Sequence, residues 1–155
     1  MGERLAYGKA APSAMKALLG FDKAVGECGL EPKLLALVEM RASQINGCAY
    51  CLDMHSKDLR AMGESEMRLY TLSAWRETPF FTDRERAALL WTETVTLISQ
   101  DHAPDAIYEE VSRCFSEAEL ANLTMAIVLI NSWNRLCISF RSVPGEYVSD
   151  RTPLA

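Results

Sequence analysis

The sequence predicts an all-α protein with about six to seven helices. Apolar residues recur at helical spacing along most of the chain, and no segment shows the alternation of apolar and polar residues that is typical of a strand. Two motifs, Thr82-x-x-Glu85 and Ser116-x-x-Glu119, have the capping-box pattern that marks a helix start. Together these observations favour a helical bundle.

The composition is that of a globular protein and excludes several functions. Of the 155 residues, 49% are hydrophobic and 24% are charged, with a net charge of -5. A negative chain without a basic block argues against nucleic acid as a partner. The longest apolar runs, 34–38 and 125–130, are shorter than the ~18 residues of a membrane span. We see no signal peptide, and expect a cytoplasmic protein with one domain over 1–155 and its core at about 12–141.

The first three helices are separated by glycine and proline signals. The first is expected at about 12–28, where a Cys-Gly-Leu-Glu-Pro segment ends it. The second, about 32–45, begins with a proline, which suits the first turn of a helix. The third, about 48–62, follows an Asn-Gly break and ends at a glycine.

The later helices are expected at about 64–75, 82–99, from near 104, and 116–140. The last of them is apolar on nearly all sides. Such a helix is central to the core or is buried by another subunit, so we expect a homo-oligomer. The tail that begins at Val143 is expected to be loosely ordered.

The segment INGCAYCLDMHSKD, residues 45–58, contains the most informative motif. Cys48, Cys51 and His55 have the spacing i, i+3, i+7, which places them on one helical face. With Cys48 in the first turn and Cys51 in the second, the helix N-terminus stabilises a thiolate. His55 can accept the thiol proton, and the cysteine spacing allows a disulfide. We predict thiol redox chemistry.

Two other interpretations of this motif remain open. Cys₂His is a partial zinc ligand set, but a structural zinc site uses four ligands and no second cluster is evident. A purely structural bridge would close a very short loop and would stabilise the fold little. The remaining cysteines, Cys28, Cys114 and Cys137, lie on apolar helix faces and are expected to be inert buried thiols.

The sequence MRASQINGCAYCLDMHSKDLRAMG, residues 40–63, resembles the AhpD-like alkylhydroperoxidases of the carboxymuconolactone decarboxylase superfamily. Segments 73–96 and 129–136 also resemble its single-domain members. The resemblance implies an AhpD-like helical bundle that assembles into trimers or hexamers. It also implies reduction of organic hydroperoxides through the Cys-x-x-Cys pair, without a metal or cofactor.

The resemblance also implies a role for each residue of the motif. Cys51 would be the peroxidatic thiol beside His55, and Cys48 would be the resolving thiol. Peroxide would oxidise Cys51 to a sulfenic acid, which Cys48 would convert to a disulfide. A dithiol electron donor, either a lipoyl-bearing or a thioredoxin-like protein, would then reduce the disulfide.

Two positions depart from the AhpD pattern. Tyr50 replaces a histidine between the cysteines, and Ala36 replaces a glutamate twelve residues before the first cysteine. Glu93 is the first candidate for the missing carboxylate, since its helix face is expected to turn inward, where a carboxylate resists ionising. It could equally be a structural carboxylate bonded to Arg or Trp. Glu39 is the second candidate, although a solvated helix residue is the commoner case.

Three classes of function therefore follow from the sequence. The leading one is a thiol-dependent peroxidase with Cys51, Cys48, His55 and Glu93 as its catalytic residues. The second is a non-enzymatic oligomer that acts as a redox sensor or binds zinc. The third is a decarboxylase-like lyase on the same fold.

Overall fold

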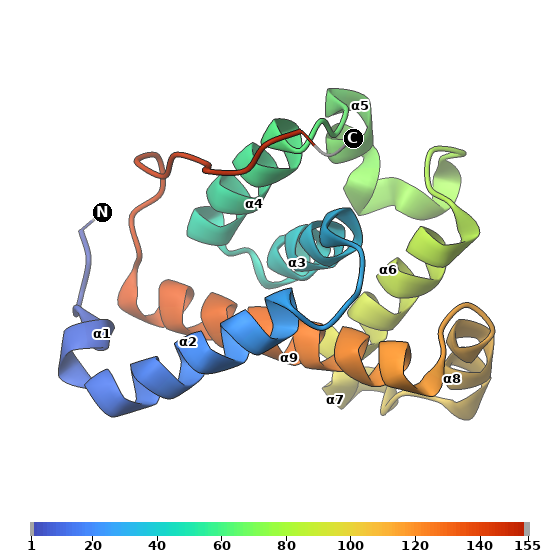
Figure 1. Ribbon diagram of the computed structural model, residues 1–155, viewed down its shortest axis with the longest axis horizontal. Coiled ribbons are helices and arrows are strands. Elements are labelled where there is room, and N and C mark those ends of the chain that lie inside the picture. The colour runs from blue at the N-terminus through green and yellow to red at the C-terminus, as the bar shows by residue number, and fades with distance from the viewer. Residues whose placement is uncertain (1, 154–155) are drawn as a thin grey trace.

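The computed structural model describes residues 2–153, which form helices joined by turns and loops (Figure 1). In chain order the helices are α1 (Tyr7–Ala10), α2 (Pro12–Gly26), α3 (Pro32–Asn46), α4 (Ala49–Ala61), α5 (Glu66–Thr71), the 3-10 helix η1 (Leu72–Glu77), α6 (Asp83–Thr96), α7 (Ile98–Asp101), α8 (Asp105–Ser112) and α9 (Glu117–Phe140). The all-α class is confirmed for this part of the chain.

The predicted number of six to seven helices is too low. Helices α1 and α7 have four residues each, which is too short to show a helical period in the sequence. The expected helix at 82–99 ends at Thr96, and α7 follows it. The expected helix at 64–75 is divided into α5 and η1, and η1 is kinked at Ala74.

Helix α3 lies at the centre and packs against α4, α6 and α9 (Figure 1). Its side chains Leu37, Val38 and Ala42 have almost no solvent exposure. Pro32 opens the helix at a position where no backbone N–H is needed. Gly47 ends it with a φ of 69°, a left-handed conformation that glycine adopts without steric cost. The central position of α3 brings its side chains close to both sulfur-bearing helices, α4 and α9.

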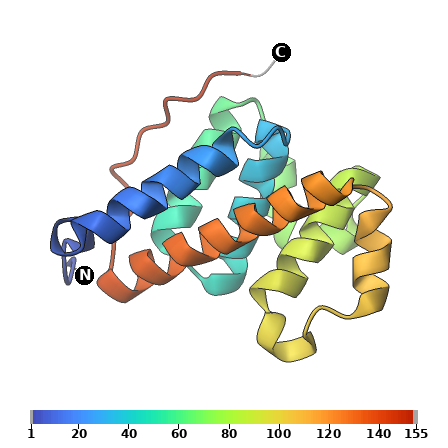
Figure 2. The same cartoon turned by 60° about the horizontal axis from the view of Figure 1, so that its bottom comes forward.

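Helix α9 is the longest, and α2 packs along it in both views (Figures 1 and 2). Both predicted capping boxes are present, at the starts of α6 and α9. By length and composition alone α9 could cross a membrane, but core helices of soluble proteins pass the same test. Here Leu123, Ile127 and Ile130 are fully buried in contacts with the rest of the fold, while Met125 and Val128 are exposed.

Residues 143–152, termed here the C-terminal strap, run without helical structure alongside α4 (Figure 1). Asp53 accepts a hydrogen bond from a strap N–H, and Lys57 donates to strap carbonyls. The hydroxyl of Tyr147 donates to Asp58 at 2.8 Å. The expectation of a loosely ordered tail is therefore wrong for these residues, because polar side chains of α4 hold them in place.

Candidate active site

The turn between α3 and α4 positions the first cysteine. The Cys48 N–H donates to the Ser43 carbonyl across this turn. The Asn46 amide donates to Asn134 Oδ1 at 2.8 Å, and the Asn134 amide donates in turn to Ser43 Oγ at 3.0 Å. Asn134 lies on α9 and is fully buried. These bonds tie the turn to α9, so the start of α4 has a fixed position against that helix.

The two cysteines of the motif are in contact. Cys48 is the N-cap of α4 with extended backbone, and Cys51 lies in the first turn. Each therefore sits earlier in the helix than the sequence suggested, because the helix begins only at Ala49. Their Sγ atoms are 2.7 Å apart, and both residues are 1% exposed. A disulfide needs only a small further approach of these two sulfurs.

His55 lies one turn after Cys51 and faces Glu39 of α3. The distance from His55 Nδ1 to Glu39 Oε2 is 3.5 Å. Among the described residues, His55 Nε2 has no hydrogen-bond partner although it is buried. Burial lowers the pKa of His55 to about 4 and, together with the charge of Asp22, raises the pKa of Glu39 to about 8. The site thus holds a neutral imidazole next to a carboxyl group that ionises near physiological pH.

The structure places Glu93 in a different network. Its carboxylate accepts hydrogen bonds from Trp75 Nε1 at 2.8 Å and from Arg41 Nε at 2.9 Å, and it pairs with Arg76. Burial works against ionisation, but these donors outweigh it and lower the pKa of Glu93. The expectation that Glu93 resists ionising is therefore wrong, and its contacts match the alternative of a structural carboxylate bonded to Arg and Trp. Glu39 occupies the position facing His55.

A third cysteine, Cys137, joins the pair, although its apolar helix face predicts an inert thiol. The Sγ atoms of Cys48, Cys51 and Cys137 all lie within 4.8 Å of one another. Cys137 is on α9, and the Tyr7 hydroxyl lies 3.9 Å from its sulfur. Sequence spacing could not reveal this approach, because it depends on how α9 packs against the start of α4.

The three thiols shift one another's pKa values. Hydrogen bonds from Cys48 and Cys51 lower the pKa of Cys137. Donation to Cys137 in turn raises the pKa of Cys51 and that of Cys48, and burial adds to both effects. The close contact of the three sulfurs therefore shifts the pKa of Cys137 and the pKa values of the other two thiols in opposite directions. Contact with Cys137 and Cys48 thus opposes the stabilisation of a Cys51 thiolate that the helix N-terminus provides.

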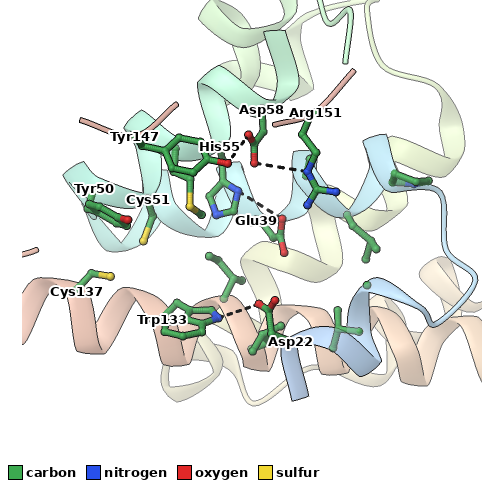
Figure 3. Close-up of a pocket in the computed structure, with 18 of the residues that line it drawn as sticks. Asp22, Glu39, Tyr50, Cys51, His55, Asp58, Trp133, Cys137, Tyr147 and Arg151 are labelled. Carbon is green, nitrogen blue, oxygen red and sulfur yellow. Dashed lines mark hydrogen bonds and ion pairs between the residues drawn. The ribbon is translucent and has the colours of Figure 1, made fainter. Parts of the chain in front are cut away.

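A cavity of about 420 Å³ lies beside these sulfurs (Figure 3). Cys51, Cys137, His55 and Glu39 line it, whereas Cys48 is not among its lining residues. In Figure 3 the sulfurs of Cys51 and Cys137 point toward each other from α4 and α9. Much of the remaining wall is apolar and comes from Val25, Leu35, Ala36, Met54, Met62, Leu129 and Ile130. The cavity can therefore hold an organic molecule with a reactive end near Cys51.

The same cluster is the one group of described residues that could hold a metal ion. Three cysteine sulfurs are a ligand set for thiophilic metals, and a structural zinc ion takes a fourth ligand. The sequence spacing alone indicates only Cys48, Cys51 and His55 for such a site. In the structure Cys137, rather than His55, is the third member of the group.

Comparison with known proteins agrees with this geometry. Residues 12–94, more than half of the chain, match the carboxymuconolactone decarboxylase family. The chain belongs to the carboxymuconolactone decarboxylase family. Within the superfamily it is an AhpD-like member, with the Cys-x-x-Cys pair and the helical bundle described above.

Relatives of this family are similar over nearly the full chain. The uncharacterized protein YdfG of Bacillus subtilis is 40% identical over 139 residues, which are 90% of this chain and 95% of YdfG. ATU0492 of Agrobacterium tumefaciens, a protein of unknown function whose name suggests an antioxidant defence protein AhpD, is 42% identical. Its crystal structure has a TM-score of 0.90, and the match covers 94% of this chain and 100% of the ATU0492 chain.

The fold also carries other chemistry. The debrominase Bmp8, whose crystal structure contains 2,3,4-tribromopyrrole, has a TM-score of 0.79 at 19% identity. The match covers 89% of this chain and 74% of Bmp8. At this identity the likeness shows the fold alone. The residues of its own site therefore determine the reaction of this carboxymuconolactone decarboxylase family member.

The AhpD-like site of this chain differs from the AhpD sequence pattern in the position of its glutamate on α3. Position 36 is alanine and lines the cavity, while Glu39, one helical turn later on α3, faces His55. Tyr50, at the position of the missing histidine, lines the cavity together with Cys51 and Cys137. Glu39 and His55 therefore form a glutamate–histidine pair whose carboxylate lies one turn later on α3 than position 36.

Proposed function

We propose that the protein is a thiol-dependent peroxidase that reduces organic hydroperoxides, with Cys51 as the peroxidatic and Cys48 as the resolving thiol. The observation that supports this most strongly is the 2.7 Å separation of the two sulfurs. Of the pair, only Cys51 is among the residues that line the cavity. A sulfur that meets the substrate with a second thiol in contact is what a dithiol peroxidase requires.

The reaction consumes two thiols and one hydroperoxide. The Cys51 sulfur attacks the terminal peroxide oxygen, so that the S–O bond forms and the O–O bond breaks. The organic oxygen leaves as an alcohol after taking a proton, and Cys51 becomes a sulfenic acid. Cys48 then attacks the Cys51 sulfur, which forms the disulfide and releases the sulfenic oxygen as water.

His55 and Glu39 are the groups that move protons in this scheme. Cys51 must lose its proton to react, and its pKa is raised in the resting cluster. His55 has a free Nε2 that can accept a proton, and its Nδ1 faces Glu39. When Glu39 is ionised, it stabilises the imidazolium that forms. This pairing supports general base catalysis by His55 with Glu39 as its partner.

The cavity lining favours organic hydroperoxides over hydrogen peroxide. Burial of an alkyl or aryl group against apolar side chains such as Leu35, Leu129 and Ile130 is favourable. Regeneration of the dithiol needs an external donor, for which we propose a lipoyl-bearing or thioredoxin-like protein. A trimer or hexamer in the cytoplasm remains part of this proposal.

Thiol titration before and after one equivalent of tert-butyl hydroperoxide tests the function. We expect the parent to lose two titratable thiols and Cys51→Ser to lose the reaction. Cys114→Ser is a matched control, since Cys114 is a partly exposed cysteine outside the cluster. If Cys51→Ser consumed the hydroperoxide at the parent rate, the proposed function would be wrong.

Metal binding is the second candidate function, and the three clustered sulfurs favour it. Zinc held by Cys48, Cys51 and Cys137 would block the thiols from peroxide. Elemental analysis of the purified protein separates the two candidates. The metal site would be favoured if the purified protein contained near-stoichiometric zinc and if removal of that zinc by chelators lowered its thermal stability.

A further inference from the structure

Cys137 has a setting that neither Cys28 nor Cys114 shares. Its sulfur is in the buried cluster with Cys48 and Cys51, whereas Cys28 and Cys114 pack against a separate hydrophobic cluster and are partly exposed. Cys137 also lines the cavity beside Cys51 and is 4% exposed. A thiol within 4.8 Å of both members of a redox pair is close enough to exchange with either after a small movement.

We propose that Cys137 is a third redox thiol of this site, which exchanges with the Cys48–Cys51 disulfide and links α4 covalently to α9. The proposal extends the proposed peroxidase function, because that reaction supplies the disulfide. It assigns to α9 a chemical role in addition to its structural one.

The exchange is balanced without any further reactant. The Cys137 thiolate attacks Cys51 Sγ in the Cys48–Cys51 disulfide. The Cys51–Cys137 bond forms while the Cys48–Cys51 bond breaks, and Cys48 leaves as a thiolate that takes the proton given up by Cys137. Cys137 is the nucleophile because it is the one member of the cluster that keeps its thiol once Cys48 and Cys51 are bonded, and its sulfur lies within 4.8 Å of both.

Cys137 can also react one step earlier. If Cys48 is absent or already bonded, the Cys137 sulfur attacks the Cys51 sulfenic acid directly. The S–S bond forms, the S–O bond breaks, and the oxygen leaves as water with the Cys137 proton. Cys137 thereby removes the sulfenic acid before a second peroxide converts it to an irreversible sulfinic acid.

Peptide mapping of the parent protein tests the exchange directly. Trypsin places Cys48 and Cys51 together in the peptide 42–57 and Cys137 alone in the peptide 136–141. The protein is oxidised with one equivalent of tert-butyl hydroperoxide or, separately, with diamide, and then quenched in acid. We expect a disulfide-linked pair of these two peptides besides the internally bridged peptide 42–57.

The Cys48→Ser variant makes the test quantitative. Serine is a good N-cap residue, so α4 is expected to keep its start. After one equivalent of hydroperoxide we expect loss of two thiols and a Cys51–Cys137 link, with no dimedone adduct at Cys51. In Cys48→Ser/Cys137→Ser the dimedone adduct is expected to persist. Cys48→Ser/Cys114→Ser is the matched control and is expected to behave like Cys48→Ser.

The two oxidants separate this proposal from the peroxidase function. Linked peptides with diamide but no thiol loss with hydroperoxide would support the exchange and overturn the peroxidase. A Cys48–Cys51 disulfide after hydroperoxide, with no linked peptides under either oxidant, would overturn the exchange and leave the peroxidase standing. A dimedone adduct in Cys48→Ser as abundant as in Cys48→Ser/Cys137→Ser would also contradict it.

Discussion

His55 of α4 and Glu39 of α3 face each other with 3.5 Å between Nδ1 and Oε2. Burial shifts their pKa values in opposite directions, that of His55 down to about 4 and that of Glu39 up to about 8. Both shifts favour the neutral form of the group. Glu39 therefore lowers the stability of the protein as pH rises above its ordinary pKa, and His55 lowers it as pH falls below its ordinary pKa.

Replacing Glu39 by Gln is expected to change the pH dependence of stability. Because the folded pKa of Glu39 lies near 8 and its ordinary value is 4.5, the folded parent loses stability as pH rises from about 4.5 to 8. Glu39→Gln lacks this loss. Relative to the parent, we expect it to gain about 3–4 kcal/mol in free energy of unfolding between pH 5 and pH 8. Urea unfolding measures this, with exposed Glu109→Gln as control. Parallel pH curves for Glu39→Gln and the parent would contradict the shift.

Loss of the imidazole is expected to slow the first chemical step. At pH 7 we expect His55→Gln to oxidise Cys51 about 100-fold more slowly than the parent, the usual scale of general base catalysis. Single-turnover kinetics with tert-butyl hydroperoxide measure the rate. His102→Gln is the control, because His102 is exposed in the turn after α7. An unchanged rate in His55→Gln would remove His55 from the mechanism.

Glu93 is expected to matter for stability rather than for catalysis. In Glu93→Gln the Arg41 guanidinium loses its charged partner and the indole of Trp75 loses part of its acceptor. We expect a loss of about 2–4 kcal/mol in free energy of unfolding. The rate of Cys51 oxidation in the remaining folded protein is expected to equal that of the parent. A Glu93→Gln variant that folds normally but reacts slowly would reverse the roles of Glu93 and Glu39.

Narrowing the cavity is expected to discriminate between peroxides. Ala36 lines the cavity, so Ala36→Leu reduces the space for a bulky substrate. We expect KM for cumene hydroperoxide to rise while KM for hydrogen peroxide changes little. Ala61→Leu is the control, since Ala61 lies on α4 but not on the cavity wall. Equal effects of Ala36→Leu on both substrates would argue against binding of the organic group in this cavity.

An oligomer is expected because apolar side chains on α9 remain exposed. Met125 is 52% exposed, Val128 44% and Ile138 45%. Light scattering of the parent is expected to give a mass well above that of the 17.3 kDa chain. We expect Val128→Glu to lower the mass, whereas Leu19→Glu, at an exposed site on α2, leaves it unchanged. A parent that is monomeric at micromolar concentration would contradict the prediction.

The sequence was sufficient for features that depend on local spacing. Helical periodicity and the capping boxes predicted the all-α class, and the i, i+3, i+7 spacing identified Cys48, Cys51 and His55. The sequence did not predict the contacts between helices. Whether Glu39 or Glu93 faces His55 depends on the packing of α3 and α6 around the site, since both lie on helices with an inward face. Cys137 was missed for the same reason, because an apolar setting is normal for an unreactive cysteine.

The strap along α4 determines how a large partner can reach the cluster. All three sulfurs are almost completely buried, so a protein dithiol cannot touch them in the structure as it stands. Tyr147 and Arg151 of the strap form part of the cavity wall. Detaching this segment breaks a few polar contacts with Asp53, Lys57 and Asp58 and unwinds no helix. Displacement of the strap would therefore open the cavity wall on this side to the protein dithiol proposed above as electron donor.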